Sequence, residues 1–133
     1  MKIEVSNGEI IDKLTILEIK LSEIKDAKKL TNIRNEYNVL TPIVESIYKA
    51  SKDDKKHLKK LQNDLLLVNK KLWKIEDDIR ECERSGNFGE TFVHLARSVY
   101  YTNDDRSDIK KAINIFTGSD LIEEKSYEDY KPQ

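Results

Sequence analysis

The chain has 133 residues, and its 24 lysine and arginine residues nearly balance 25 aspartate and glutamate residues, for a formal net charge of -1. This length suits one core of three or four helices, so we expect a single domain over residues 1–133, and the balanced charge argues against nucleic acid or a membrane as a partner. Charged residues make up 37% of the chain, with only four glycines and two prolines, a composition typical of amphipathic helices rather than sheets.

Two helices are predicted in the first 50 residues. Ser6 and Glu9 have the spacing of a capping box, which predicts a first helix over about residues 8–25. Asp26 can cap a second helix that carries an apolar stripe at helical spacing. Pro42 lies inside this stripe and predicts a kink or a new helical start, because proline lacks the amide hydrogen that a helix interior needs.

The third predicted helix is the longest. Apolar residues repeat at heptad spacing through roughly residues 52–84, a length of about 50 Å at ~1.5 Å per residue. A cluster of turn-forming residues follows at 85–89. Because the loops are short, successive helices should be antiparallel neighbours, and the predicted fold is an all-α, up-down-up-down helical bundle with a long third helix.

A fourth helix is predicted from Glu90 until Gly118 closes it. Its continuity is open, because Thr102 and Asp105 form a second capping-box-like start in its middle. Residues 119–133 have no helical period and form a tail that either packs across the bundle or is disordered.

Polar residues interrupt the apolar stripe of this fourth helix. Asn103, Arg106 and Lys110 take positions that should face the core. A buried charge without a partner is costly, so partners are expected, and a structured set of buried polar groups marks a candidate site.

More polar residues should lie at the same level of the bundle. Counting about sixteen residues outward from the turn near residue 87 brings residues 69–73 level with residues 103–106. The same count from the turn near residue 26 places residues 9–13 at the same end of the bundle as these polar residues. The predicted ligand-binding residues, drawn from three helices, are Glu9, Asp12, Lys13, Asn69, Trp73, Asn103, Arg106 and Lys110.

This polar layer has two interpretations. In one, Arg106 pairs with Asp12 or Glu9, Asn69 pairs with Asn103, and the network only sets the register of the helices. In the other, the layer is a ligand site. Trp73, beside the apolar seam, either packs at the edge of the core or stacks on the ligand.

Four segments of the chain resemble a known family. They are residues 5–20 (VSNGEIIDKLTILEIK), 68–80 (VNKKLWKIEDDIR), 92–106 (FVHLARSVYYTNDDR) and 123–127 (EEKSY). Together they resemble a bacterial and phage family of short helical proteins that is known only as a domain of unknown function. The resemblance implies a stand-alone helical domain and brings the tail into the candidate site, but it implies no activity.

The residues support two hypotheses of function. We favour a non-catalytic binding module without a cofactor, in which Arg106, Lys110 and Lys13 hold a small anionic ligand or a protein partner while Asn69 and Asn103 orient it.

The alternative is a metal-dependent hydrolase of a phosphorylated compound. Here Glu9, Asp12 and Glu76 would bind Mg²⁺, as carboxylates do in all-helical nucleotide pyrophosphohydrolases.

The setting of the protein is also predicted. A single cysteine, no apolar run approaching the ~20 residues that cross a bilayer, and no signal-peptide core at the start favour the cytoplasm. The long third helix should extend past its neighbours and expose apolar positions near Leu58, so self-association as a homodimer is left open.

Overall fold

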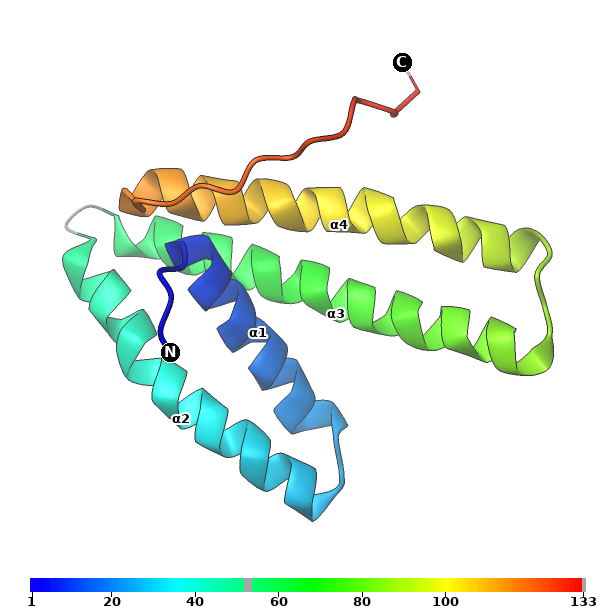
Figure 1. Ribbon diagram of the computed structural model, residues 1–133, viewed down its shortest axis with the longest axis horizontal. Helices are drawn as coiled ribbons and strands as arrows, with labels where there is room; N and C mark the ends of the chain where they lie inside the picture. The colour runs from blue at the N-terminus through cyan, green and yellow to red at the C-terminus, as the bar shows by residue number, and fades with distance from the viewer. Residues whose placement is uncertain (52–53, 133) are drawn as a thin grey trace.

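The computed structural model describes residues 1–51 and 54–132, and the described residues form four helices and no strand (Figure 1). The helices are α1 (Asn7–Glu23), α2 (Ala27–Ala50), α3 (Lys55–Ser85) and α4 (Glu90–Thr117). The predicted all-α class is confirmed, and the arrangement is consistent with a helical bundle. The predicted start of the third helix, at residues 52–53, lies outside the described part of the chain.

Local capping signals fix most helix ends. The Ser6 hydroxyl accepts the Glu9 amide hydrogen at 3.2 Å, and Asp26 accepts that of Lys29 at 2.9 Å. α4 ends at Gly118, whose φ of 65° is the left-handed conformation that glycine adopts without strain.

Two predicted interruptions do not break their helices. α2 continues through Pro42, and the carbonyl that loses its partner there belongs to the exposed Asn38, which water can reach. α4 continues through Thr102, which is 2% exposed. A buried position favours continuation, because a new start there would bury unpaired backbone groups.

The helices form two hairpins, α1–α2 and α3–α4. In Figure 1 the α1–α2 hairpin lies obliquely across the α3–α4 hairpin. α1 contacts all three other helices, whereas α2 packs mainly on α1. The core lies where the hairpins cross, and its fully buried residues include Ile11, Leu58, Leu65 and Ile113. The prediction that α3 exposes apolar positions near Leu58 is wrong, because that part of α3 packs into the core.

The loop end of the α3–α4 hairpin projects beyond α1 and α2 (Figure 1). Its seam residues Phe92, Ala96 and Val99 are only half-buried, and Phe88 and Val93 are exposed. In the described part of the chain, this end of the molecule therefore consists of two helices with no third helix over their seam.

The tail after Gly118 lies along α4 (Figure 1). Glu124 pairs with Lys111 at 3.2 Å, and Lys125 lies 3.5 Å from Asp108. The tail therefore contacts α4 rather than packing across the bundle, and its residues 120–132 stay exposed. None of the helices in the described ranges has the length and apolarity needed to cross a bilayer.

Candidate functional site

A buried polar network joins α1, α3 and α4 at the crossing of the hairpins. Its centre is Asp12, which is 1% exposed. The Asp12 carboxylate accepts hydrogen bonds from Arg106 Nε and Asn69 Nδ2, both at 2.9 Å, and from Arg106 Nη2. Asn69 Nδ2 also donates to the Thr15 hydroxyl at 2.8 Å. The predicted pairing of Arg106 with Asp12 is confirmed, whereas Asn69 bonds to α1 rather than to Asn103.

Close contact between α1 and α4 brings Asp12 within reach of Arg106. Gly8 donates its amide hydrogen to Oδ1 of the buried Asn114 at 2.6 Å. A Cβ atom at Gly8 would lie 2.4 Å from the carbonyl oxygen of Lys110, which is closer than real Cβ contacts come. Glycine at this position therefore lets the two helices approach, and Asp12 follows one turn later.

The three predicted cationic groups all have carboxylate partners. Hydrogen bonding to Asp12 raises the pKa of Arg106 above its usual value, so its guanidinium stays charged. The Lys110 ammonium lies 2.7 Å from Glu9 and 3.5 Å from Glu123.

The third cation, Lys13, turns toward α2 and pairs with Glu36 at 2.7 Å. The positive charge expected in the layer is therefore neutralised by these pairs.

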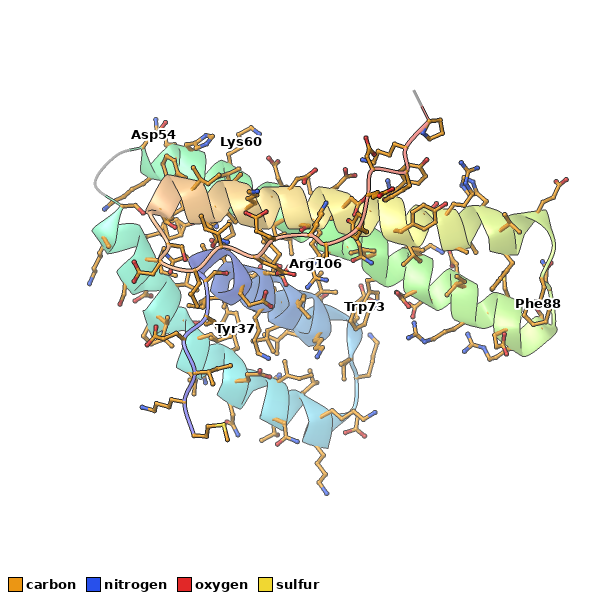
Figure 2. The ribbon with its side chains drawn as sticks, turned by 45° about the horizontal axis from the view of Figure 1, so that its top comes forward. Tyr37, Asp54, Lys60, Trp73, Phe88 and Arg106 are labelled. Carbon is orange, nitrogen blue, oxygen red and sulfur yellow. The ribbon has the colours of Figure 1, made fainter. Side chains whose placement is uncertain are left out.

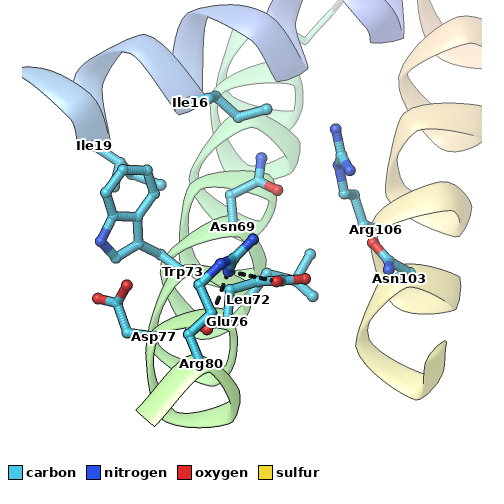
Figure 3. Close-up of a pocket in the computed structure, with 10 residues that line it drawn as sticks. All are labelled: Ile16, Ile19, Asn69, Leu72, Trp73, Glu76, Asp77, Arg80, Asn103 and Arg106. Atoms are coloured by element: carbon cyan, nitrogen blue, oxygen red, sulfur yellow. Dashed lines mark hydrogen bonds and ion pairs between the residues drawn. The ribbon is translucent and has the colours of Figure 1, made fainter. Parts of the chain in front are cut away.

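A cleft of about 500 Å³ lies beside the network, between α1, α3 and α4 (Figures 2 and 3). We call it the Trp73 cleft. Figure 3 shows Trp73 on α3 standing across it from Asn103 and Arg106 on α4, with Ile16 and Ile19 of α1 at one side. Its lining residues are Ile16, Ile19, Asn69, Leu72, Trp73, Glu76, Asp77, Arg80, Asn103 and Arg106.

A smaller cleft of about 230 Å³ also reaches Arg106. It is lined by Glu9, Asp12, Lys13, Ile16, Leu17, Lys20, Glu36 and Arg106. Seven of the eight predicted residues therefore line one or both clefts, with Arg106 in both, whereas Lys110 lines neither. Asn69, Trp73 and Asn103 line the Trp73 cleft, while Glu9, Asp12 and Lys13 line the smaller one.

The carboxylates of the predicted Mg²⁺ site are not brought together. Glu9 pairs with Lys110, Asp12 with Arg106, and Glu76 with Arg80 at 2.7 Å. In residues 1–51 and 54–132, no group of three histidine, cysteine, aspartate or glutamate side chains is placed to hold a metal ion. The geometry gives the metal-dependent hypothesis no support.

Asp104 is a second buried acid that the sequence analysis missed. It is 7% exposed, and its carboxylate accepts hydrogen bonds from the hydroxyls of Tyr127 and Tyr130 in the tail. The Lys125 ammonium lies 3.4 Å away. Bonding to Tyr127, with a further contribution from Tyr130, lowers the pKa of Asp104. The resemblance of residues 123–127 to the family pattern was the only sequence signal for this contact.

No curated protein and no solved structure matches the chain. The sequence profile of a family described as a family of unknown function (DUF6165) matches residues 1–131. That range includes all four helices, the polar network, the Trp73 cleft and the tail residues that bind Asp104. Because the match spans nearly the whole chain, the protein belongs to this family.

Proposed function

We propose that the protein is a non-catalytic binding module that takes a small ligand, or a side chain of a partner protein, into the Trp73 cleft. The observation that carries this proposal is the cleft itself. Its volume of about 500 Å³ falls within the roughly 300–1,000 Å³ typical of ligand sites. An indole ring forms one wall, and hydrogen-bonding groups stand opposite it (Figure 3).

Arg106 and Asn103 are the groups that would recognise the ligand by hydrogen bonding. Arg106 uses Nε and Nη2 for Asp12, and Nη1 bonds to no other described residue. Nη1 and the exposed Asn103 amide can therefore donate to a carbonyl, carboxylate or phosphate oxygen. Because the cations are already paired, hydrogen bonding and stacking contribute more to this recognition than net positive charge does.

A non-catalytic role fits the acids near the cleft. Asp12 and Glu76 each form an ion pair with a guanidinium, so both carboxylates already have a partner within the protein. The Asp12 network is a fixed support that holds Arg106 at the edge of the cleft.

Trp73 is the only tryptophan in the chain, so its fluorescence reports on this cleft alone. We expect at least one member of a panel of nucleotides, sugar phosphates and amino-acid amides to change the emission saturably and to raise Tm. Ligand at 100 times Kd stabilises by about 2.7 kcal/mol.

Asn103→Ala should weaken that binding by about three- to tenfold, the effect of one lost hydrogen bond. Asn38→Ala, which alters an exposed asparagine on α2, is the matched control and should change nothing. A panel in which no compound shifts emission or Tm overturns the proposal, and so does an equal response of the two variants.

A further inference from the structure

We infer that the Trp73 cleft holds an organic cation, a guanidinium or ammonium group of the ligand, between the Trp73 indole and the Asp77 carboxylate. This inference rests on the proposed function and names the ligand chemistry. Trp73 and Asp77 lie four residues apart on α3, so they share one face of the helix, and both line the cleft. Figure 3 shows the Asp77 carboxylate on the same side of the cleft as the indole ring.

The charge of Asp77 is available to a ligand because the neighbouring cations are engaged elsewhere. Lys74 pairs with Asp78 at 2.6 Å, and Arg80 pairs with Glu76 at 2.7 Å. No ion pair joins Asp77 to another described residue. The two nearest cations on the helix, three residues before and three residues after Asp77, are therefore each paired with a different carboxylate.

The lining of the cleft leads to the same conclusion. Its two guanidinium groups, Arg80 and Arg106, each have a carboxylate partner, in Glu76 and Asp12. Once these pairs are counted as neutral, Asp77 is the remaining charge of the lining. An exposed negative charge beside an aromatic face favours a positive group there.

An indole beside a carboxylate is well suited to a cation. The face of tryptophan attracts a cation more strongly than other aromatic side chains do, and a planar guanidinium can stack on it while donating to a carboxylate. Ile16 and Ile19 offer apolar contact for the chain that carries the cation. A ligand in this position would direct its oxygen acceptors across the cleft, toward Asn103 and Arg106 (Figure 3).

Comparing arginine and citrulline derivatives as ligands separates the effect of ligand charge from the effect of ligand shape. The side chain of citrulline has the shape of arginine but is neutral. We expect N-acetyl-arginine amide to change Trp73 fluorescence saturably, with a Kd at least about tenfold lower than that of N-acetyl-citrulline amide, as a charge-assisted hydrogen bond to Asp77 predicts.

A pentapeptide with arginine between glycines distinguishes the two sources of the cation. Tighter binding of the peptide than of the amide assigns the cation to a protein partner, and equal binding assigns it to a free small molecule.

Asp77→Asn should weaken binding of the arginine amide at least about tenfold and leave citrulline binding unchanged. Asp64→Asn is the matched control, because Asp64 also lies on α3 and pairs with a lysine four residues away, Lys60 at 2.9 Å, but does not line the cleft. Trp73→Leu, measured by calorimetry because the fluorophore is lost, should also weaken arginine binding.

The failures of the two proposals are distinguishable. Equal affinity for arginine and citrulline amides overturns the cation inference, and so does an equal effect of Asp77→Asn and Asp64→Asn. In either case, a ligand whose binding is weakened by Asn103→Ala still supports the proposed function. If no compound of either series or of the wider panel binds, the proposed function itself is overturned.

Discussion

Asp12 and Glu9 are carboxylates three residues apart on α1, and both pair with a cation of α4. The Asp12 side chain is 1% exposed, whereas that of Glu9 is 47% exposed. Burial decides how much stability each ion pair contributes. A buried ion has lost its water and relies on its protein partners, whereas an exposed ion that loses its partner is hydrated instead.

We predict that Asp12→Ala lowers the free energy of unfolding by about 2–3 kcal/mol, because Arg106 and Asn69 lose their acceptor in a buried site. The estimate is toward the low end for a broken buried pair, since the Arg106 side chain is 28% exposed and water can reach part of it. Glu9→Ala, the matched control, should cost less than about 1 kcal/mol. Urea denaturation measures both, and equal losses would contradict the prediction.

Residues whose contacts lie within one helix were predictable from the sequence. Residues that contact another helix were predicted only in part. Ser6 and Asp26 cap their helices as predicted, because a capping bond joins residues three apart in the sequence. Thr15 was missed, since its bond with Asn69 exists only where α1 crosses α3. Asn103 was predicted to pair with Asn69 but instead lies across the cleft from Trp73 (Figure 3).

Among the contacts between the tail and α4, those of Asp104 involve a buried side chain of the helix. Tyr127 and Tyr130 donate to Asp104, and this bonding lowers the pKa of Asp104. The ionised carboxylate is therefore the form that the docked tail favours. Docking should be complete above the ordinary carboxyl pKa and be lost as the pH falls through the lowered value.

Burial, followed by bonding to Asp104, raises the pKa of Tyr130. Its phenol therefore keeps its proton at a pH where a free tyrosine ionises, so docking should persist into the alkaline range and be lost only as the pH rises through the raised pKa.

We predict that Asp104→Asn at neutral pH frees residues 121–132 from α4, because an amide lacks the charge that strengthens both tyrosine bonds. Nuclear magnetic resonance relaxation of the tail amides measures their mobility. Asp108→Asn is the control, since Asp108 is exposed and only approaches Lys125 at 3.5 Å, and it should leave the tail docked. A tail that stays rigid in Asp104→Asn would show that the other contacts suffice.

Helix continuity was harder to predict than helix ends. Thr102 with Asp105 has the sequence of a cap, and Pro42 has the chemistry of a helix breaker. In both cases the tertiary setting decides. Thr102 is covered by other residues, and the carbonyl freed by Pro42 belongs to the exposed residue Asn38. Neither condition can be read from the residue types alone.

For the molecule as a whole, counting residues from the turns placed the right residues near one another, because Asp12 and Glu9 of α1 meet Arg106 and Lys110 of α4. The count assumes helices that run side by side, which is true within the α3–α4 hairpin and brings Trp73 opposite Asn103 and Arg106. The α1–α2 hairpin crosses obliquely, so the residues of α1 meet Arg106 from another side (Figure 1). The single predicted layer therefore became two clefts joined by one guanidinium.

This crossing also divides α3 and α4 into a supported half and a projecting half. At the crossing, Leu58, Leu65 and Ile113 are fully buried, whereas Phe92 and Val99 in the projecting half remain half-buried. Local stability follows buried apolar contact, so the two halves of one continuous helix should open with different free energies.

We predict that backbone amides of residues 76–99 exchange hydrogen at least about tenfold faster than those of residues 58–69, a difference of about 1.4 kcal/mol in opening free energy. Hydrogen exchange followed by mass spectrometry measures both segments in one sample, and residues 106–113 of α4 serve as an internal control that should match the slower segment. Equal protection at low protein concentration would contradict the prediction. Protection of residues 76–99 that increases with protein concentration would instead show a second copy covering Phe88 and Val93, because an apolar surface shielded only by self-association loses its cover on dilution.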